Sequence, residues 1–109
     1  MKQITYAGDS VLTTDDVGSA LVELTACLAR KGLAEAVSIP ILLEGEVRDA
    51  ELVIGVGNDV LSIPIDFDGD GPDFSVAADR LRSQMEAHTA DRVVRPTALD
   101  DSFDDFFDV

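Results

Sequence analysis

The sequence predicts an α+β domain in which a four-stranded, mostly antiparallel sheet carries two helices packed on one face, in the order β-α-β-β-β-α. Three observations support this. Apolar residues alternate with polar ones through residues 36–66, as in strands with one buried face. Apolar residues recur at helical spacing in 14–31 and again in 74–89. The chain has 109 residues, which is the usual size of one domain.

The domain is expected to span residues 1–95, with a separate acidic tail over 96–109. No apolar run approaches the roughly 20 residues that cross a bilayer, and residues 1–6 lack the apolar segment of a signal peptide. The single cysteine, Cys27, excludes an internal disulfide framework. These features predict a cytoplasmic protein.

The first strand is expected at residues 3–7, ended by Gly-Asp-Ser at 8–10. The helix over 14–31 should begin at Thr13, with Asp16 completing a pair that caps the positive helix end. Its core-facing stripe is Val17, Ala20, Leu21, Leu24 and Leu28. Gly32 follows as a left-handed C-terminal cap. If the first strand joins the sheet, a right-handed crossover through this helix makes it parallel to the next strand.

Residues 36–66 are expected to form three consecutive antiparallel strands. The alternating apolar sets are Val37, Ile39, Ile41 and Leu43, then Leu52, Ile54 and Val56, then Leu61, Ile63 and Ile65. Turn residues separate them at 44–46 and 57–59. Ser-Ile-Pro-Ile occurs at 38–41 and at 62–65. Because proline has no N–H, both prolines should face away from the middle strand.

The second helix is expected over residues 74–89, with Asp73 or Ser75 at its start. Its apolar stripe is Phe74, Ala78, Leu81, Met85 and His88. His88 is the only histidine, so a metal site with two histidines does not exist in this chain. We interpret His88 as a partly buried or capping residue and Cys27 as a small buried residue of the core.

Charge is the most unusual property of the composition. The chain has 22 acidic and 8 basic residues, giving a net charge of −14. Such a surface repels nucleic acid and anionic lipid, so we expect neither a nucleic-acid partner nor a membrane partner. A basic partner, a bound cation or simple solubility each account for the charge.

The segment Asp66-Phe67-Asp68-Gly69-Asp70-Gly71 resembles the first half of a calcium-binding loop. Such loops place carboxylates at positions 1, 3 and 5 and glycine at position 6, which makes Asp66, Asp68 and Asp70 the candidate metal ligands. The resemblance stops there, because Ala77 stands where the bidentate glutamate belongs. The alternative is an acidic solvated turn.

The tail alternates carboxylates with aromatic rings. Phe103, Phe106 and Phe107 would share one face of a helix, with Asp104 and Asp105 beside them, and such a segment can dock in a basic or apolar groove. In character the tail is similar to the acidic tails of bacterial single-stranded-DNA-binding proteins, although it ends in Val109 and follows no nucleic-acid-binding body. A solubilising tail, or one that docks on its own sheet or a neighbour's, remains open.

The residues show no nucleophile elbow, phosphate loop or Cys/His set. The sequence therefore predicts a small non-enzymatic interaction or regulatory domain. Its partner would be a protein with a basic or apolar groove that receives the tail, and a homodimer is also compatible. The alternative is a calcium-binding module that uses the loop over 66–73.

Overall fold

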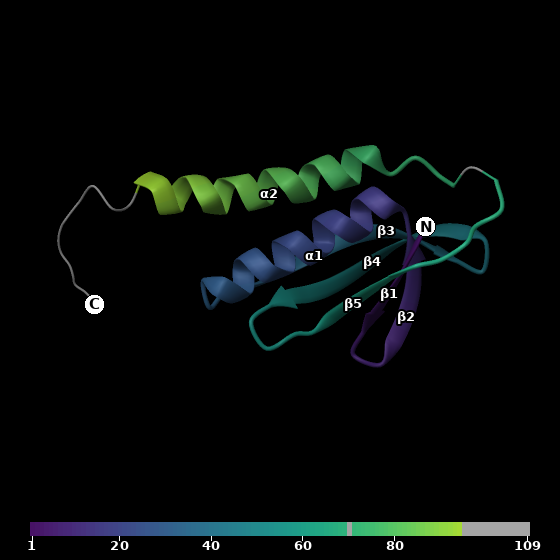
Figure 1. The fold of residues 1–109 in the computed structure, drawn as a ribbon, viewed down its shortest axis with the longest axis horizontal. Coiled ribbons are helices and arrows are strands. Elements are labelled where there is room, and N and C mark those ends of the chain that lie inside the picture. The colour runs from purple at the N-terminus through teal and green to yellow at the C-terminus, as the bar shows by residue number, and fades with distance from the viewer. Residues whose placement is uncertain (70, 95–109) are drawn as a thin grey trace.

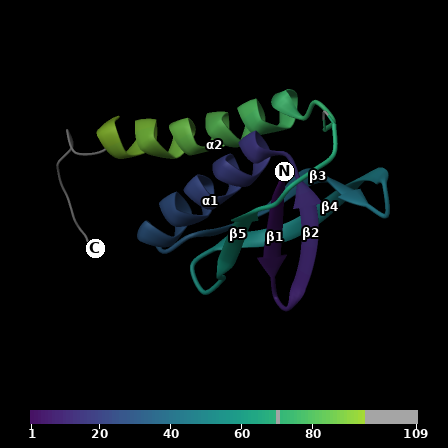
Figure 2. The ribbon, with the colours of Figure 1, turned by 45° about the vertical axis from the view of Figure 1, so that its right-hand side comes forward.

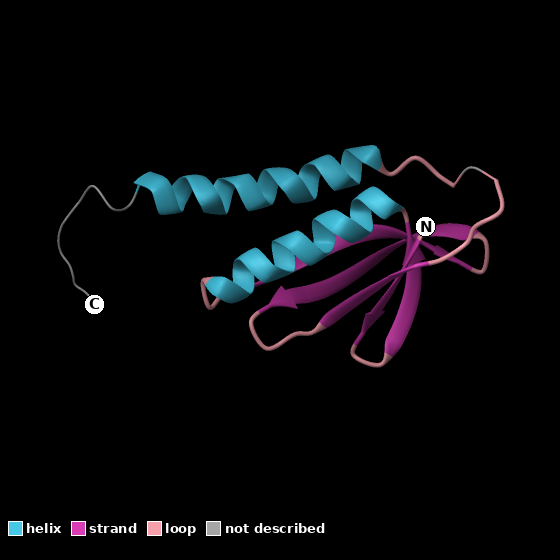
Figure 3. Ribbon diagram, in the orientation of Figure 1, coloured by secondary structure: helices cyan, strands magenta, loops and turns pink. Residues whose placement is uncertain are grey.

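The computed structural model describes residues 1–69 and 71–94, and these form an α+β fold with five antiparallel strands and two helices (Figures 1 and 3). The α+β class is as predicted, but the sheet has five strands instead of four. In chain order the elements are β1 (Lys2–Tyr6), β2 (Asp9–Thr13), α1 (Asp15–Arg30), β3 (Ala34–Leu43), β4 (Glu46–Gly55), β5 (Val60–Pro64) and α2 (Ser75–Val94).

The additional strand is β2, which forms a hairpin with β1. Tyr6 pairs with Asp9, so Ala7 and Gly8 make a two-residue turn. Their φ angles are +53° and +88°, the left-handed pair that a type I′ turn requires. The first strand does end before Gly8, as predicted, but the sequence analysis missed that the chain reverses there and continues in the sheet as β2.

The strand order across the sheet is β4-β3-β2-β1-β5, and every neighbouring pair is antiparallel. The predicted series of three consecutive strands is correct only for β3 and β4. After β4 the chain crosses to the opposite edge, where β5 pairs with β1. The first predicted strand, β1, runs parallel to β3 as expected, because both are antiparallel to β2, which lies between them in the sheet.

Pro40 and Pro64, the two strand prolines, have different neighbours in the sheet. The Pro40 carbonyl accepts a hydrogen bond of 2.8 Å from Thr13 Oγ1, so this backbone unit faces β2 and turns away from β4, as predicted. Pro64 lies opposite Lys2 of β1 and does not adjoin β4. It forms part of the outer edge of the sheet.

The core lies between α1 and one face of the sheet, which we call the inner face. All five residues of the predicted α1 stripe are buried. The helix begins one residue later than predicted: Thr14 is its N-cap, and the Asp16 carboxylate accepts from the backbone N–H of Val17. Its end is as predicted. Gly32 has φ +69°, and Leu33 N–H donates to the Leu28 carbonyl at 2.9 Å, the longer bond of a Schellman cap.

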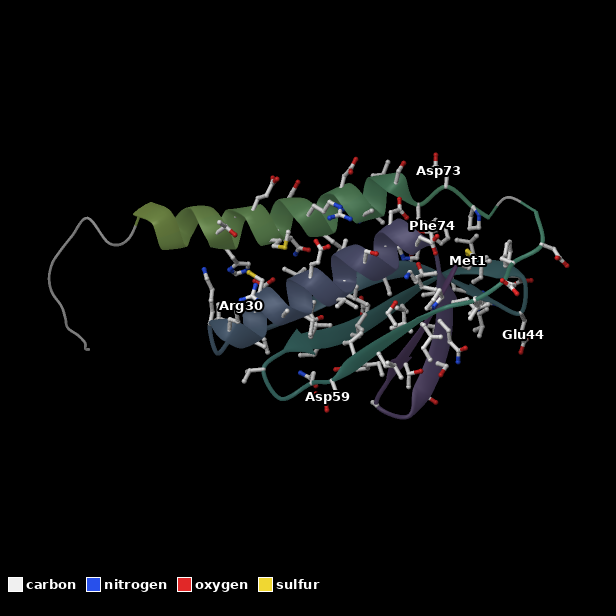
Figure 4. The ribbon with its side chains drawn as sticks, in the orientation of Figure 1. Met1, Arg30, Glu44, Asp59, Asp73 and Phe74 are labelled. Carbon is white, nitrogen blue, oxygen red and sulfur yellow. The ribbon has the colours of Figure 1, made fainter. Side chains whose placement is uncertain are left out.

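Helix α2 packs mainly on α1 and forms an outer layer on the same side of the sheet (Figure 1). Phe74, Ala78 and Leu81 are buried, and Figure 4 shows Phe74 on the side of α1 and Asp73 on the outer side. The Asp73 carboxylate accepts from the Ser75 N–H at 3.0 Å, which caps the helix start. The two predicted helices thus share a side of the sheet but lie in successive layers.

Candidate functional site

A hollow of about 300 Å³ opens where the sheet divides. β2 and β3 pair at one position, Leu12 with Leu42, and beyond it the β1–β2 hairpin runs away from β3 and β4 (Figure 2). We call this space the hairpin hollow. Its lining residues are Ile4, Tyr6, Ala7, Asp9, Val11, Ile39, Ala50, Glu51 and Leu52.

The walls of the hairpin hollow are mainly apolar. Ile4 and Ile39 are each 1 % exposed and belong to the core. Tyr6 contributes its ring, while its hydroxyl donates to the Val53 carbonyl and lies 3.1 Å from Asn58 Oδ1. Two acids, Asp9 and Glu51, complete the lining, and both are exposed. The hollow can therefore hold apolar side chains beside positively charged groups.

The edge of β4 borders this hollow. Ala50, Glu51 and Leu52 all line it, although side chains of successive strand residues point to opposite faces. Glu51 can line this inner-face space through its backbone, and Tyr6 of the same lining reaches the backbone of β4, where its hydroxyl donates to the Val53 carbonyl. β4 is an outermost strand of the sheet, so its edge opens into the hairpin hollow.

A second apolar surface lies on the outer face of the sheet, opposite α1. The pairing register places Val47, Leu42, Leu12, Gln3 and Ile63 in one row across all five strands. Leu61, two residues from Ile63, is on the same face. Val47 is 58 % exposed, Leu61 56 % and Ile63 42 %. The alternation in β5 thus directs its leucine and isoleucine to solvent, while Val60 lies against the core.

The predicted calcium ligands are in part outside the described residues. Asp66 and Asp68 are exposed, and Asp70 is not described. Among the residues whose side chains are described, 1–69 and 71–89, no three His, Cys, Asp or Glu residues are close enough together to hold a metal ion. Asp66 lines a shallow depression that also contains Asp15 and Met1. There the Met1 amino group lies 2.9 Å from Asp15 and, by hydrogen bonding, lowers the pKa of that carboxyl.

The predicted partner-binding residues Phe103, Asp104, Asp105, Phe106 and Phe107 all lie outside the described residues. Docking of the tail therefore stays a prediction.

The sequence interpretation of two single residues is confirmed. Cys27 is buried and 5 % exposed. His88 is partly buried, and its Nε2 lies 3.0 Å from the carboxylate of Glu35 on β3. His88 therefore contributes to holding α2 against the body of the protein.

Sequence reasoning missed the hairpin hollow completely. Its residues come from four strands, and their proximity depends on the divergence of β2 from β3. The available signal was Gly8, which allows a tight hairpin turn and with it the extra strand. The acids Asp9 and Glu51 have no distinguishing neighbours in the sequence.

A comparison with known protein families, a search of curated proteins and a search of solved structures found no match for this chain. Neither helix in the described part of the chain is long and apolar enough to cross a membrane.

Proposed function

We propose that this chain is a non-enzymatic interaction domain that binds a partner protein. The observation that carries the proposal is the hairpin hollow, an apolar space beside the β4 edge of the sheet that also has the acidic residues Asp9 and Glu51 in its lining. The Phe/Asp tail over 96–109 is proposed as a second contact with the same or another protein, in the manner of an acidic docking segment.

The chemistry of the hollow supports a protein ligand. Removing the apolar walls from water is favourable, and the exposed carboxylates of Asp9 beside the hollow and of Glu51 on the outer face of β4 favour cationic neighbours. A volume of about 300 Å³ is at the lower limit for small-molecule pockets. The apolar row on the outer face adds further surface of the kind that proteins cover. The net charge of −14 disfavours nucleic acid as the ligand.

The test is affinity capture from a lysate with three full-length baits in addition to the original protein. Ala50→Phe fills the hairpin hollow with a ring. Ala36→Phe makes the same change at an exposed position on the outer face of β3. The third bait carries serine at Phe103, Phe106 and Phe107. Circular dichroism establishes that each bait is folded.

Loss of a specific prey with Ala50→Phe or with the serine bait, but not with Ala36→Phe, is the expected result. Loss with Ala36→Phe alone would move the interface to the outer face and leave the proposed function intact. If all four baits capture the same proteins in the same amounts, none of these surfaces recruits a partner and the proposed function is wrong.

A further inference from the structure

The hydrogen-bonding pattern between β3 and β4 determines which backbone groups of β4 are free. Val56 N–H donates to the Leu33 carbonyl at 2.8 Å, which makes this a hydrogen-bonded pair. Hydrogen-bonded and non-hydrogen-bonded pairs alternate along an antiparallel ladder. In the register of β3 with β4, Glu51 lies opposite Ser38 and Asp49 opposite Pro40, and both are non-hydrogen-bonded pairs. The N–H and C=O groups of Asp49 and Glu51 therefore point away from β3.

Two further contacts support this assignment. The carbonyl of Pro40 accepts from Thr13 Oγ1, so it points to β2 and not to Asp49. The carbonyl of Val53, which has the same parity as Glu51, accepts from the Tyr6 hydroxyl and so points outward as well. Tyr6 therefore occupies the edge of β4 at Val53. The outward N–H and C=O groups of Val47, Asp49 and Glu51 lie earlier in the strand and stay available for pairing.

We propose that β4 is a strand-addition site, at which an extended segment of a partner protein with alternating apolar and basic residues pairs with residues 47–51. This inference rests on the proposed function and names the binding mode and the partner's chemistry. Backbone hydrogen bonds to Val47, Asp49 and Glu51 would supply affinity, and the two faces of β4 would supply specificity.

The preference for apolar residues in the partner segment comes from the inner face of the sheet. Ala50 and Leu52 point to this face and line the hairpin hollow together with Val11 and Ile4. Side chains of an added strand that lie opposite Ala50 enter the same hollow, because paired residues share a face of the sheet. Small or medium aliphatic side chains suit a space of about 300 Å³.

The preference for lysine or arginine in the partner segment comes from the outer face of the sheet. Asp49 and Glu51 are both exposed there, and an added strand would place its alternate residues directly opposite them. Opposite charges at such cross-strand positions stabilise pairing, and like charges destabilise it. A lysine or arginine at these positions is therefore favoured, and an aspartate or glutamate is rejected.

The same rule argues against two occupants from this chain. Residues 100–109 contain five aspartates and no basic residue, so the tail would place acids opposite acids. A second copy pairing β4 with β4 would bring Asp49 and Glu51 against their own equivalents. A partner segment with positive charge is the occupant that the edge selects.

The test titrates a short peptide of alternating valine and lysine into the full-length protein, with amide signals followed by nuclear magnetic resonance. We expect the Asp49 and Glu51 amides to shift and to become protected from exchange. Glu51→Pro removes one outward N–H and should abolish binding. Ser62→Pro is the matched control, because it makes the same kind of change in β5. Lysine at both Asp49 and Glu51 should weaken binding about tenfold or more, whereas lysine at Asp79 and Glu86 on α2 should leave it within about twofold.

Four results would overturn the inference. These are equal binding to Glu51→Pro, shifts confined to other surfaces, no binding at millimolar peptide, or binding of a valine–glutamate peptide with the same affinity. Shifts of the Asp49 and Glu51 amides when Phe103, Phe106 and Phe107 become serine would identify the tail as the occupant instead. Concentration-dependent dimerisation that Glu51→Pro abolishes would identify a second copy. The proposed function is tested separately, by prey capture, and survives each of these results if a prey depends on the tail or the outer face.

Discussion

The two edges of the sheet are protected from uncontrolled pairing by different means. β5 has five residues and carries Pro64. Ile65 N–H donates to the Met1 carbonyl at 3.1 Å, so Pro64, one residue earlier, has its nitrogen on the outer side of the edge. β4 has ten residues and no proline. It presents its outward N–H groups beside an apolar hollow, and Asp49 and Glu51 flank them.

The two edges therefore differ in selectivity: β5 is short and lacks one outward donor for any incoming strand, whereas β4 keeps its outward donors and discriminates by charge. A proline removes a hydrogen-bond donor whatever the incoming sequence. A carboxylate leaves the donor in place and disfavours only segments that place an acidic residue opposite it. In a chain with a net charge of −14, acids on β4 also oppose pairing between copies. We infer that β5 is a structural boundary and that β4 is retained for binding.

The largest expected effect is the loss of stability when proline replaces a residue of β4 whose N–H donates to β3, compared with a residue whose N–H points away from β3. Ala50 lies opposite Ile39 in a hydrogen-bonded pair, so Ala50→Pro should remove a ladder bond and lower the free energy of unfolding by about 3 kcal/mol or more. Glu51→Pro should cost clearly less, because that N–H points outward. Urea denaturation of both variants measures the difference, and equal losses would contradict the assigned orientation of β4.

Gly55, at the end of β4, permits the crossing to the β5 edge. Its φ is +122°, and a Cβ there would lie 2.2 Å from the Leu33 carbonyl oxygen. Gly55→Ala should lower the free energy of unfolding by about 2–3 kcal/mol. Gly57→Ala is the control with a positive φ but no nearby atom, and its smaller loss in chemical denaturation isolates the contribution of the clash. Similar losses for both would show that backbone conformation alone is responsible.

The turn that joins β3 to β4 can be stabilised by a substitution. Glu44 and Gly45 have φ values of +52° and +81°, a type I′ turn in which glutamate is unfavourable and asparagine is preferred. Glu44→Asn should raise the free energy of unfolding by about 0.5–1 kcal/mol, as measured by the denaturation midpoint. Peptide binding at residues 47–51 should not weaken, because the edge itself is unchanged. A lower midpoint would contradict the turn assignment.

The smallest expected effect is on the free energy of unfolding when the acidic residues of the β4 edge are replaced, compared with replacement of Asp73, which caps α2. Asp49→Asn with Glu51→Gln should not lower stability, because neither carboxylate has an ion pair or hydrogen bond within the described residues. Asp73→Ala should lower it slightly, since Asp73 caps α2. A stability loss from the β4 substitutions that matches Asp73→Ala would show that the edge acids have a structural role.

The Asp73 contribution should also depend on pH. Hydrogen bonds from Ser75 hold the pKa of Asp73 below its ordinary value, so the ionised carboxyl is favoured in the folded state. Its stabilising effect is therefore complete above the unfolded-state pKa, near pH 4, and disappears as the pH falls through the lower folded-state pKa. The difference between the original protein and Asp73→Ala should shrink over that range. A difference that grows on acidification would contradict this.

The parts of the fold that the sequence predicted depend on local signals. The α1 stripe and its Gly32 cap are determined by residues within a few positions of one another, and both were found. The alternation in 37–41 and 52–54 correctly identified the inner-facing residues of β3 and β4, but Leu43 and Val56, which were predicted to continue these sets, are 46 % and 49 % exposed. The α2 stripe was also found, although the helix extends to Val94 and not to residue 89.

The remainder depends on long-range pairing. Alternation places Leu61 and Ile63 on one face but cannot show that β5 pairs with β1 and exposes them. The turn at Ala7 and Gly8 lacks the usual Asn-Gly or Asp-Gly signal, so β2 was missed. The hairpin hollow exists because β2 meets β3 at one position, which no local pattern encodes. Of the predicted site residues, Asp66 and Asp68 are described and exposed, whereas Asp70 and the tail lie outside the described residues.

Hydrogen exchange of the backbone amides of β4 in the free, full-length protein tests the central claim most directly. The account predicts alternation: Arg48, Ala50 and Leu52 exchange slowly because they donate to β3, whereas Asp49 and Glu51 exchange rapidly because they face solvent at an open edge. Slow exchange at all five positions would mean that the edge is already covered, and β4 would not be the selective docking edge that we propose.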